Sequence, residues 1–225
     1  MVRNIPLLGG FFTITASENM TNCYSHVRAG NVTTCPRCKE MSHADSFALV
    51  NRLVWEGVSS VSESVRVIAW TWAWNPKDTK KVIEKLPKEI AVMGVSEQGI
   101  EKIIGDTPTS VYDYSISVEG PGEYALDTWD YAHQMGHKAF AKLQMNNSWE
   151  MAAVPYLPVF EKTYRHMKGL LDAGEGRPNG LMLSWTQGGC PSLLLQFISA
   201  FYEKKDTLPT IEEIYEEIFN KEDVP

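Results

Sequence analysis

Four carboxylic side chains in this sequence follow strand-like apolar segments, where they could act as acids, bases or nucleophiles. Glu18 lies at the end of Phe11–Asn19, Glu97 ends Ile90–Glu97, and Glu150 ends the segment Ala139–Glu150. Asp113 lies further along the loop after Glu97. Two carboxyl groups on either side of a glycosidic bond can hydrolyse it, with retention at a separation of about 5–5.5 Å and inversion at about 6.5–9.5 Å. We predict Glu18 as the general acid and Glu150 as the nucleophile or base, with Glu97 as a third candidate. The alternative for each is a surface residue or one at a helix start.

Aromatic and amide side chains gather at the same segment ends. Tryptophan stacks on the apolar faces of sugars and donates one N–H bond, although core packing is an equally ordinary role for it. Asparagine and aspartate at such positions could bind sugar hydroxyls, and Asp113 could do this instead of proton transfer. The predicted substrate-binding residues are Asn19, Trp72, Trp74, Asp113, Asn146, Asn147, Trp149 and Trp185.

A loop at 22–39 is rich in cysteine. Cys35 and Cys38 have the Cys-x-x-Cys spacing of a zinc knuckle, and Cys23 and His26 could complete a Cys3His site. His43 could replace His26. Such a site would staple a long loop beside the active site. A disulfide or reduced free thiols are the alternatives.

Five strand-like segments must position these groups, and helical segments alternate with them. The segments are Phe11–Asn19, Val67–Asn75, Ile90–Glu97, Ala139–Glu150 and Gly180–Gly189. Such alternation predicts an α/β fold with a parallel sheet, and an α/β barrel collects its active site at the carboxyl ends of its strands. Five strands do not close a TIM (β/α)8 barrel. We therefore expect an incomplete barrel, strands four to eight of eight, and an open five-stranded sheet is the alternative.

The helices are expected from their periodicity and end signals. Ser42 should cap a helix that runs to about Val61, and Pro87 should follow the end of a short helix at Asp78–Leu86. Thr109–Glu119 alternates like a strand but follows Glu97 too closely for a full crossover. We expect it to form an excursion strand or a lid. Further helices are predicted at Thr128–Met135, within Val154–Leu171, at Leu193–Lys204 and at Ile211–Asn220.

Composition narrows the classes of function. The chain has 225 residues, 44% hydrophobic and 22% charged, which favours one globular domain over 1–225. Its net charge of −7 argues against nucleic acid as a partner. We expect no membrane span and no signal peptide at the first residues, hence a cytoplasmic protein. An unclosed sheet edge would favour a homo-oligomer.

Several short motifs make the chain resemble bacterial TIM-barrel glycoside hydrolase-like proteins, related to family 20 hexosaminidases and α-glucuronidases. They are SEN followed by C-x11-C-x2-C, AWTWAWNP, NNSWE and LSWTQGG. The resemblance implies a sugar substrate and hydrolysis by two carboxylates. The acid of hexosaminidases belongs to an Asp-Glu pair, whereas this chain has Ser17-Glu18, so the N-acetyl-assisted mechanism is not carried over.

The sequence thus predicts a glycoside hydrolase. The alternative is a non-catalytic carbohydrate-binding protein on a degenerate or truncated barrel. Both share the tryptophan-lined site and differ in whether the carboxyl groups are aimed at the scissile bond.

Overall fold

The computed structural model describes residues 1–5, 7–17, 19–28, 30–146, 156–184, 192–204 and 206–219. The chain has a mixed α/β fold and divides into two compact units. Unit 1 comprises residues 1–94 and 127–140, and unit 2 comprises residues 95–126 and 141–225. The boundary between the units passes through β3, α3 and β6, whose bounds are given below.

Five strands form one sheet in the order β1-β2-β3-β6-β7. Their bounds are Gly10–Ile14, Arg66–Trp70, Ala91–Val95, Ala139–Lys142 and Gly180–Met182. β1 pairs with β2, and β2 with β3, in parallel. The backbone bonds from Val92 to Lys138 and from Ser96 to Lys142 advance together along both chains, which gives the same direction to β6. The five predicted strands are thus confirmed as shorter elements, and the parallel order is consistent with an incomplete α/β barrel.

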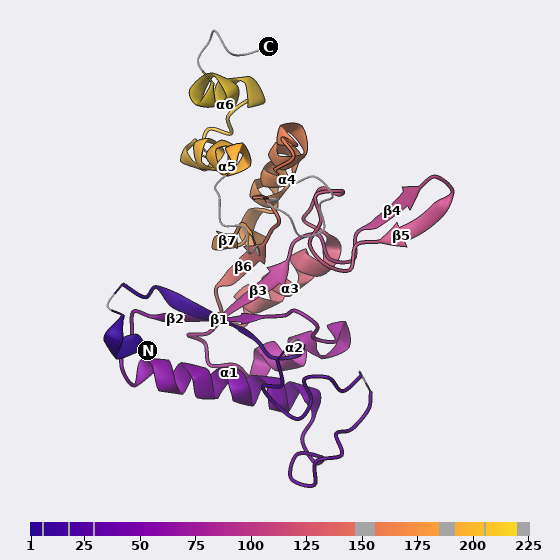
Figure 1. Ribbon diagram of the computed structural model, residues 1–225, viewed down its shortest axis with the longest axis vertical. Helices are drawn as coiled ribbons and strands as arrows, with labels where there is room; N and C mark the ends of the chain where they lie inside the picture. Colours follow the sequence, from indigo (N-terminus) through magenta and orange to yellow (C-terminus); the bar gives the residue numbers. More distant parts are fainter. Residues whose placement is uncertain are drawn as a thin grey trace. The chain divides into compact units, whose positions relative to one another are not determined.

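In unit 1 the helices α1 (His43–Ser59) and α2 (Pro76–Lys85) lie side by side (Figure 1). α1 begins at the predicted cap: Ser42 accepts from the backbone of Asp45, whose carboxylate accepts in return from the backbone N–H of Ser42. This reciprocal pairing satisfies amides that a helix start leaves without partners. Asn75 caps α2 in a similar way, through the backbone N–H of Lys77. The short 3-10 helix η1 (Val2–Asn4) precedes β1.

The third strand is the most buried element of the sheet. All five residues of β3 are buried, as expected for a parallel strand covered on both faces. α3 (Glu123–Gln134) follows, and Trp129 of this helix is fully buried. The predicted helix Thr128–Met135 therefore begins five residues earlier than its sequence pattern indicated.

In unit 2 an antiparallel hairpin, β4 (Glu101–Ile104) and β5 (Thr107–Ser110), lies in the connection after β3 (Figure 1). The excursion expected at Thr109–Glu119 is therefore a hairpin that starts earlier, followed by a loop at 111–119. The remaining elements are α4 (Phe160–Asp172), η2 (Gly174–Gly176), α5 (Leu193–Glu203) and α6 (Ile211–Ile218). Phe197 and Phe201 of α5 are fully buried, and Phe197 packs on Phe160 of α4.

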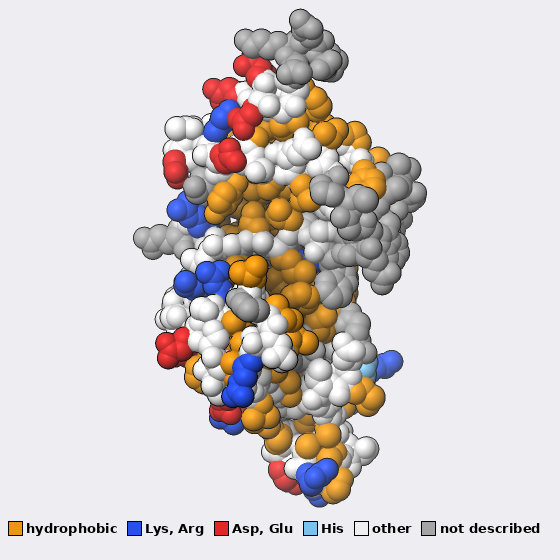
Figure 2. All heavy atoms as spheres, turned by 60° about the vertical axis from the view of Figure 1, so that its left-hand side comes forward, with side chains coloured by type: hydrophobic (Ala, Val, Ile, Leu, Met, Phe, Trp, Pro, Cys, Tyr) orange, Lys and Arg blue, Asp and Glu red, His pale blue; other side chains and the backbone are white. Residues whose placement is uncertain are grey.

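The face shown in Figure 2 carries acidic and basic side chains interspersed with hydrophobic ones. Several large apolar residues are exposed in the described part of the chain, including Ile103 and Ile104 of the hairpin. Scattered exposed apolar residues are ordinary for a globular surface. Among the described helices, none has the length and apolar character needed to cross a membrane.

Candidate functional site

Glu97 lies two residues beyond the carboxyl end of β3 and is held there by backbone bonds on its neighbour. The N–H of Ser96 donates to the carbonyl of Lys142 at 3.1 Å, and the carbonyl of Ser96 accepts from Gly122 N at 2.8 Å. The strand direction then carries the Glu97 side chain into the interior, where it is 1% exposed. A carboxyl group so deeply buried is rare unless it has a partner or a function.

Two buried side chains surround this carboxyl group. His166 of α4 places Nδ1 at 3.8 Å from Glu97 Oε1, and its Nε2 is 2.8 Å from Ser96 Oγ. We call Ser96, Glu97 and His166 the Glu97 cluster. Gly120 packs directly against it: a Cβ at Gly120 would lie 2.7 Å from both His166 Nε2 and Ser96 Oγ. The cluster therefore requires a glycine at this position.

Burial controls the protonation of the cluster. The pKa of Glu97 is raised from 4.5 to about 8, mainly because burial removes solvent from the carboxyl group, and the charge of Asp113 contributes to the rise. Opposing effects come from the Lys142 charge and from the backbone N–H groups of Glu97 and Ser115. Burial lowers the pKa of His166 from 6.5 to about 4. At neutral pH the carboxyl group is therefore protonated and the imidazole is neutral.

Polar side chains at the end of β6 lie in the same unit. Lys142 is fully buried, donates to Leu143 O at 2.7 Å and to Gln144 Oε1 at 3.2 Å, and lies 3.8 Å from the ring centre of Tyr114. An aromatic face and two oxygens thus stabilise the buried ammonium group. Asn146, a predicted substrate-binding residue, is 6% exposed and accepts through Oδ1 from Ser192 N at 3.0 Å.

A small cavity of about 10 Å³ adjoins the Glu97 carboxyl group. This is about the volume that one water molecule requires. Glu97 Oε2 is buried and has no hydrogen-bond partner among the residues that the structure describes. The residues around the cavity are Glu97, Ser115, Ile116, Val118, Gln144, Met145, Val159, Lys162, Thr163 and His166.

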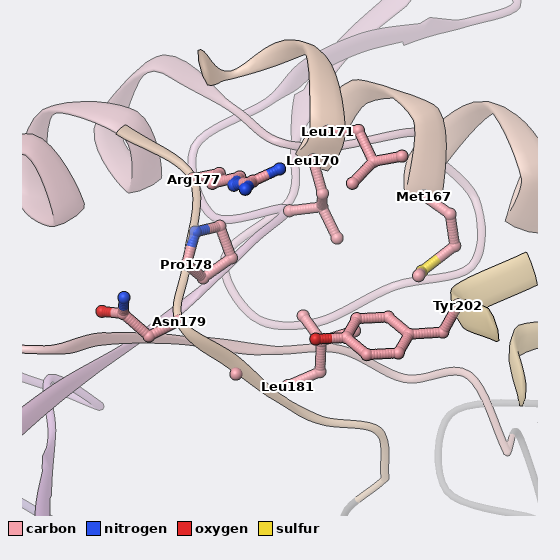
Figure 3. A pocket seen from close by; sticks show the side chains of 9 residues that line it. Met167, Leu170, Leu171, Arg177, Pro178, Asn179, Leu181 and Tyr202 are labelled. Atoms are coloured by element: carbon pink, nitrogen blue, oxygen red, sulfur yellow. The ribbon is translucent and has the colours of Figure 1, made fainter. Parts of the chain in front are cut away.

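A larger cavity of about 240 Å³ lies apart from these groups (Figure 3). Met167 and Leu170 project from α4 toward Tyr202 of α5, and Arg177 lies at one side. Apolar side chains make up most of its wall, and none of the predicted site residues lines it. It is lined by no carboxyl, imidazole or thiol group, so the Glu97 cluster is the better candidate for chemistry.

The other predicted residues have different surroundings. Trp74 is 2% exposed, donates from Nε1 to Thr15 Oγ1 at 3.0 Å, and stacks on Phe47 of α1. It is thus a core residue and presents no ring face to a ligand. Trp72 is half-buried beside Trp70, and Asn19 is exposed. Glu18, Asn147, Trp149, Glu150 and Trp185 lie outside the described residues.

The sequence prediction missed two members of the Glu97 cluster, Ser96 and His166. The one further from Glu97 in sequence is His166. It occupies a position on α4 whose spacing matches the buried positions Thr163, Met167 and Leu170. A histidine within the buried stripe of an amphipathic helix is the signal that pointed to it. A functional role could not be distinguished from core packing, because its partner Ser96 is 70 residues away in sequence.

The predicted cysteine cluster is present in unit 1. Sulfur atoms of Cys23, Cys35 and Cys38 all lie within 4.8 Å of one another, and these three residues could hold a metal ion. None of the three is in a disulfide. Among described residues, neither His26 nor His43 supplies a ring nitrogen to the group. His43 instead lies with Nε2 at 3.2 Å from Val27 O.

The backbone around Cys35 stabilises the thiolate form of this residue. Backbone N–H groups of Arg37 and Cys38 donate to Cys35 and lower its pKa from 9.0 to about 7. Hydrogen bonds with Cys38 and Cys35 raise the pKa of Cys23 to about 11. A metal ion prefers the deprotonated thiol, so Cys35 is the thiol best prepared to begin binding.

Comparison with known proteins assigns no family to this arrangement. No protein-family model matches the sequence, and no curated protein matches it. The function of this chain must therefore be inferred from the residues of the two clusters.

Proposed function

We propose that this chain forms part of a glycoside hydrolase in which Glu97 is the proton donor. One observation carries the proposal: Glu97 is a carboxyl group with 1% exposure beside a small cavity past the end of a parallel strand, and burial raises its pKa to about 8. A general acid needs a pKa near the working pH, and burial is the usual way to achieve this in a glycosidase.

The second carboxyl group would remain ionised. Asp113 is half-buried and its charge acts on Glu97, which fits the division between a protonated acid and an ionised partner. Glu18 and Glu150 remain sequence predictions for the same role, since they follow β1 and β6 in the sequence. Gln144 and Asn146 would bind sugar hydroxyls.

The loop at 111–119 would have to move for a sugar to reach the acid. Ser115, Ile116 and Val118 line the cavity beside Glu97, so this loop covers the carboxyl group. Exposed charged contacts hold the loop: Glu119 pairs with Arg165 at 2.9 Å and with Lys162 at 3.5 Å. Contacts of this kind contribute little to stability, which is consistent with a loop that opens.

The fold supports this function by analogy. We propose that the five strands are strands four to eight of a TIM-type barrel of the hexosaminidase or α-glucuronidase kind. The resemblance of the short motifs and the parallel strand order support this proposal. In such barrels the carboxyl ends of the strands carry the active site.

A screen of chromogenic glycosides, including N-acetylglucosaminides, galactosides and glucuronides, tests the proposal. We expect turnover by the unaltered chain, its loss in Glu97→Gln, and full retention in Glu101→Gln, which changes an exposed glutamate of the hairpin. Asp113→Asn, Glu18→Gln and Glu150→Gln would identify the second carboxylate. Full activity in Glu97→Gln would remove Glu97 from the mechanism.

The alternative is a carbohydrate-binding protein without turnover, in which a glycan binds away from Glu97. A carboxyl group with 1% exposure and a cavity for one water molecule does not admit a sugar ring in the closed arrangement. Calorimetric binding of a glycan without hydrolysis, retained in Glu97→Gln, would favour this alternative.

For the cysteine cluster we propose zinc, held by Cys23, Cys35 and Cys38, with His26 as the predicted fourth ligand after a change of side-chain conformation. Three thiolates and an imidazole match the preferences of a structural zinc site. Elemental analysis should find one zinc per chain and less than a tenth of that in Cys35→Ser. Equal zinc in Cys35→Ser and the unaltered chain would contradict this assignment.

A further inference from the structure

The Glu97 cluster contains a chain of hydrogen-bonding groups that ends at the small cavity. Ser96 Oγ is 2.8 Å from His166 Nε2, His166 Nδ1 is 3.8 Å from Glu97 Oε1, and Glu97 Oε2 lies buried beside the cavity. Ser96, Glu97 and His166 are 0%, 1% and 3% exposed. The side-chain protons of these three residues are therefore shared among a few buried groups instead of being exchanged freely with solvent.

A neutral imidazole has two tautomers and the Glu97 proton can lie on either oxygen, which gives four arrangements. With Nε2–H and a proton on Oε2, the bare Nδ1 and Oε1 would face each other as two acceptors, and with Nδ1–H and a proton on Oε1 two hydrogens would face each other. The two arrangements that place one hydrogen between Nδ1 and Oε1 remain. In the first, Nε2–H donates to Ser96, and the Glu97 proton lies on Oε1 facing the bare Nδ1. At 3.8 Å this O–H···N contact is longer than a hydrogen bond, so the strongest donor of the cluster is left unused. Oε2 would also lack a donor among the described residues, giving two unsatisfied groups.

In the second arrangement Ser96 Oγ–H donates to Nε2, and Nδ1–H points to Oε1. The Glu97 proton then lies on Oε2 and faces the cavity, where an oxygen atom can accept it at full hydrogen-bond strength. Only the weaker N–H···O contact is long, and contacts of this kind often shorten when a ligand binds. This arrangement leaves fewer buried groups unsatisfied.

We propose that Ser96 and His166 form a directional chain that places the Glu97 proton on Oε2, and that the cavity is a binding site for a single acceptor oxygen of the ligand. The assignment rests on the proposed function, in which this oxygen is the glycosidic one. His166 is a positioning residue, because it acts on the substrate only through Glu97.

The hydrogen-bonded groups of the Glu97 cluster also stabilise the charge that forms during proton transfer. The Oε2–H bond breaks, an O–H bond forms on the leaving group, and the electrons of its C–O bond stay with that oxygen. Glu97 becomes a carboxylate whose Oε1 faces the N–H of His166. This N–H group stabilises the new charge without transferring its own proton.

The charged groups around the cluster come from each neighbouring element. Lys142 of β6 and Asp113 of the covering loop act on Glu97, and Glu119 acts on His166. Glu119 is itself paired with Lys162 and Arg165 of α4. Burial outweighs the effect of Glu119, so His166 stays neutral and keeps a single N–H.

The protonated nitrogen of His166 can be observed directly. Long-range ¹H–¹⁵N correlation spectra of the ¹⁵N-labelled chain at pH 7 should show the Nδ1–H tautomer for His166, identified by its absence in His166→Gln. In Ser96→Ala the Nε2–H tautomer should become detectable, because the hydroxyl donor is lost. Ser25→Ala, which removes another buried serine hydroxyl from unit 1, should leave the spectrum of His166 unchanged. An Nε2–H tautomer or an imidazolium in the unaltered chain would overturn the proposal.

A second measurement follows the carboxyl group itself. In chains labelled with ¹³C at glutamate Cδ, the Glu97 pKa should rise in Ser96→Ala by on the order of one pH unit, because the N–H that faces Oε1 is no longer fixed. An unchanged or lowered pKa contradicts the directional chain. If Ser96→Ala does not fold, the tautomer of His166 in the unaltered protein still tests the proposal. An Nδ1–H tautomer without glycoside turnover would contradict the proposed enzymatic function but support the directional arrangement of Ser96, His166 and Glu97. Turnover with the Nε2–H tautomer would support the enzymatic function but contradict the directional arrangement.

Discussion

Replacing Glu97 by glutamine should change how stability depends on pH. The folded chain holds the Glu97 proton up to about pH 8, whereas an ordinary glutamate loses it near 4.5. Between these values the folded state binds more protons than the unfolded state, so stability falls as pH rises. At about 1.4 kcal/mol per pH unit the full effect is about 5 kcal/mol.

His166 acts in the opposite sense. Its pKa is about 4 when folded and 6.5 ordinarily, so the unfolded state binds more protons between these values, and stability falls as pH falls. From pH 4.5 to 6.5 the two slopes cancel. From pH 6.5 to 8 only Glu97 contributes, and the unaltered chain should lose about 2 kcal/mol.

Urea unfolding followed by circular dichroism at pH 5, 6.5, 8 and 9 measures this difference. Glu97→Gln keeps the shape of the side chain without its ionisation, so its stability should not show the fall between pH 6.5 and 8. Between pH 6.5 and 5 it should lose about 2 kcal/mol through His166. Glu101→Gln provides the matched control, and other titrating groups cancel in the comparison. Parallel curves for the unaltered chain and Glu97→Gln from pH 6.5 to 8 would show that Glu97 does not hold its proton in this range.

Three further substitutions test the packing, each by urea unfolding. Trp74→Phe removes the N–H bond to Thr15 in the core and should cost about 1–3 kcal/mol, an effect that should largely vanish in a Thr15→Val background. Gly120→Ala would place a Cβ 2.7 Å from two polar atoms of the Glu97 cluster and should cost about 1–3 kcal/mol, while Gly9→Ala, with open space around it, should be nearly neutral. Ser42→Ala removes the α1 cap and should cost about 1 kcal/mol; no loss would mean that water replaces the cap fully.

The sequence predicted the elements better than the site because elements follow from local patterns. Ser42 and the apolar spacing after it located α1, and the apolar run Ile90–Val95 located β3. The strand ends were predicted less well: β2 stops at Trp70, and the chain turns so that Trp74 points into the core. Sequence cannot distinguish an indole that packs on Phe47 from one that faces a ligand, since the partner comes from another element.

The site depended on long-range contacts that no local pattern encodes. Glu97 was one carboxylate among several in the sequence, and only its burial and its contact with His166 single it out. The cysteine spacing, by contrast, predicted the grouping of Cys23, Cys35 and Cys38, because two of the three lie in one short turn. His26 did not join the group, since spacing along the chain does not determine the direction of its side chain.

The β4–β5 hairpin has a consequence for protein engineering. Its outer residues Glu101 and Ser110 are paired across the hairpin, so the two points of attachment to the rest of unit 2 are adjacent. A segment whose ends meet can be shortened to a tight turn, or exchanged for another peptide, without stretching the chain on either side. The hairpin between Ile100 and Val111 is thus a natural cassette position, suited to carrying an epitope or a spectroscopic label on this protein.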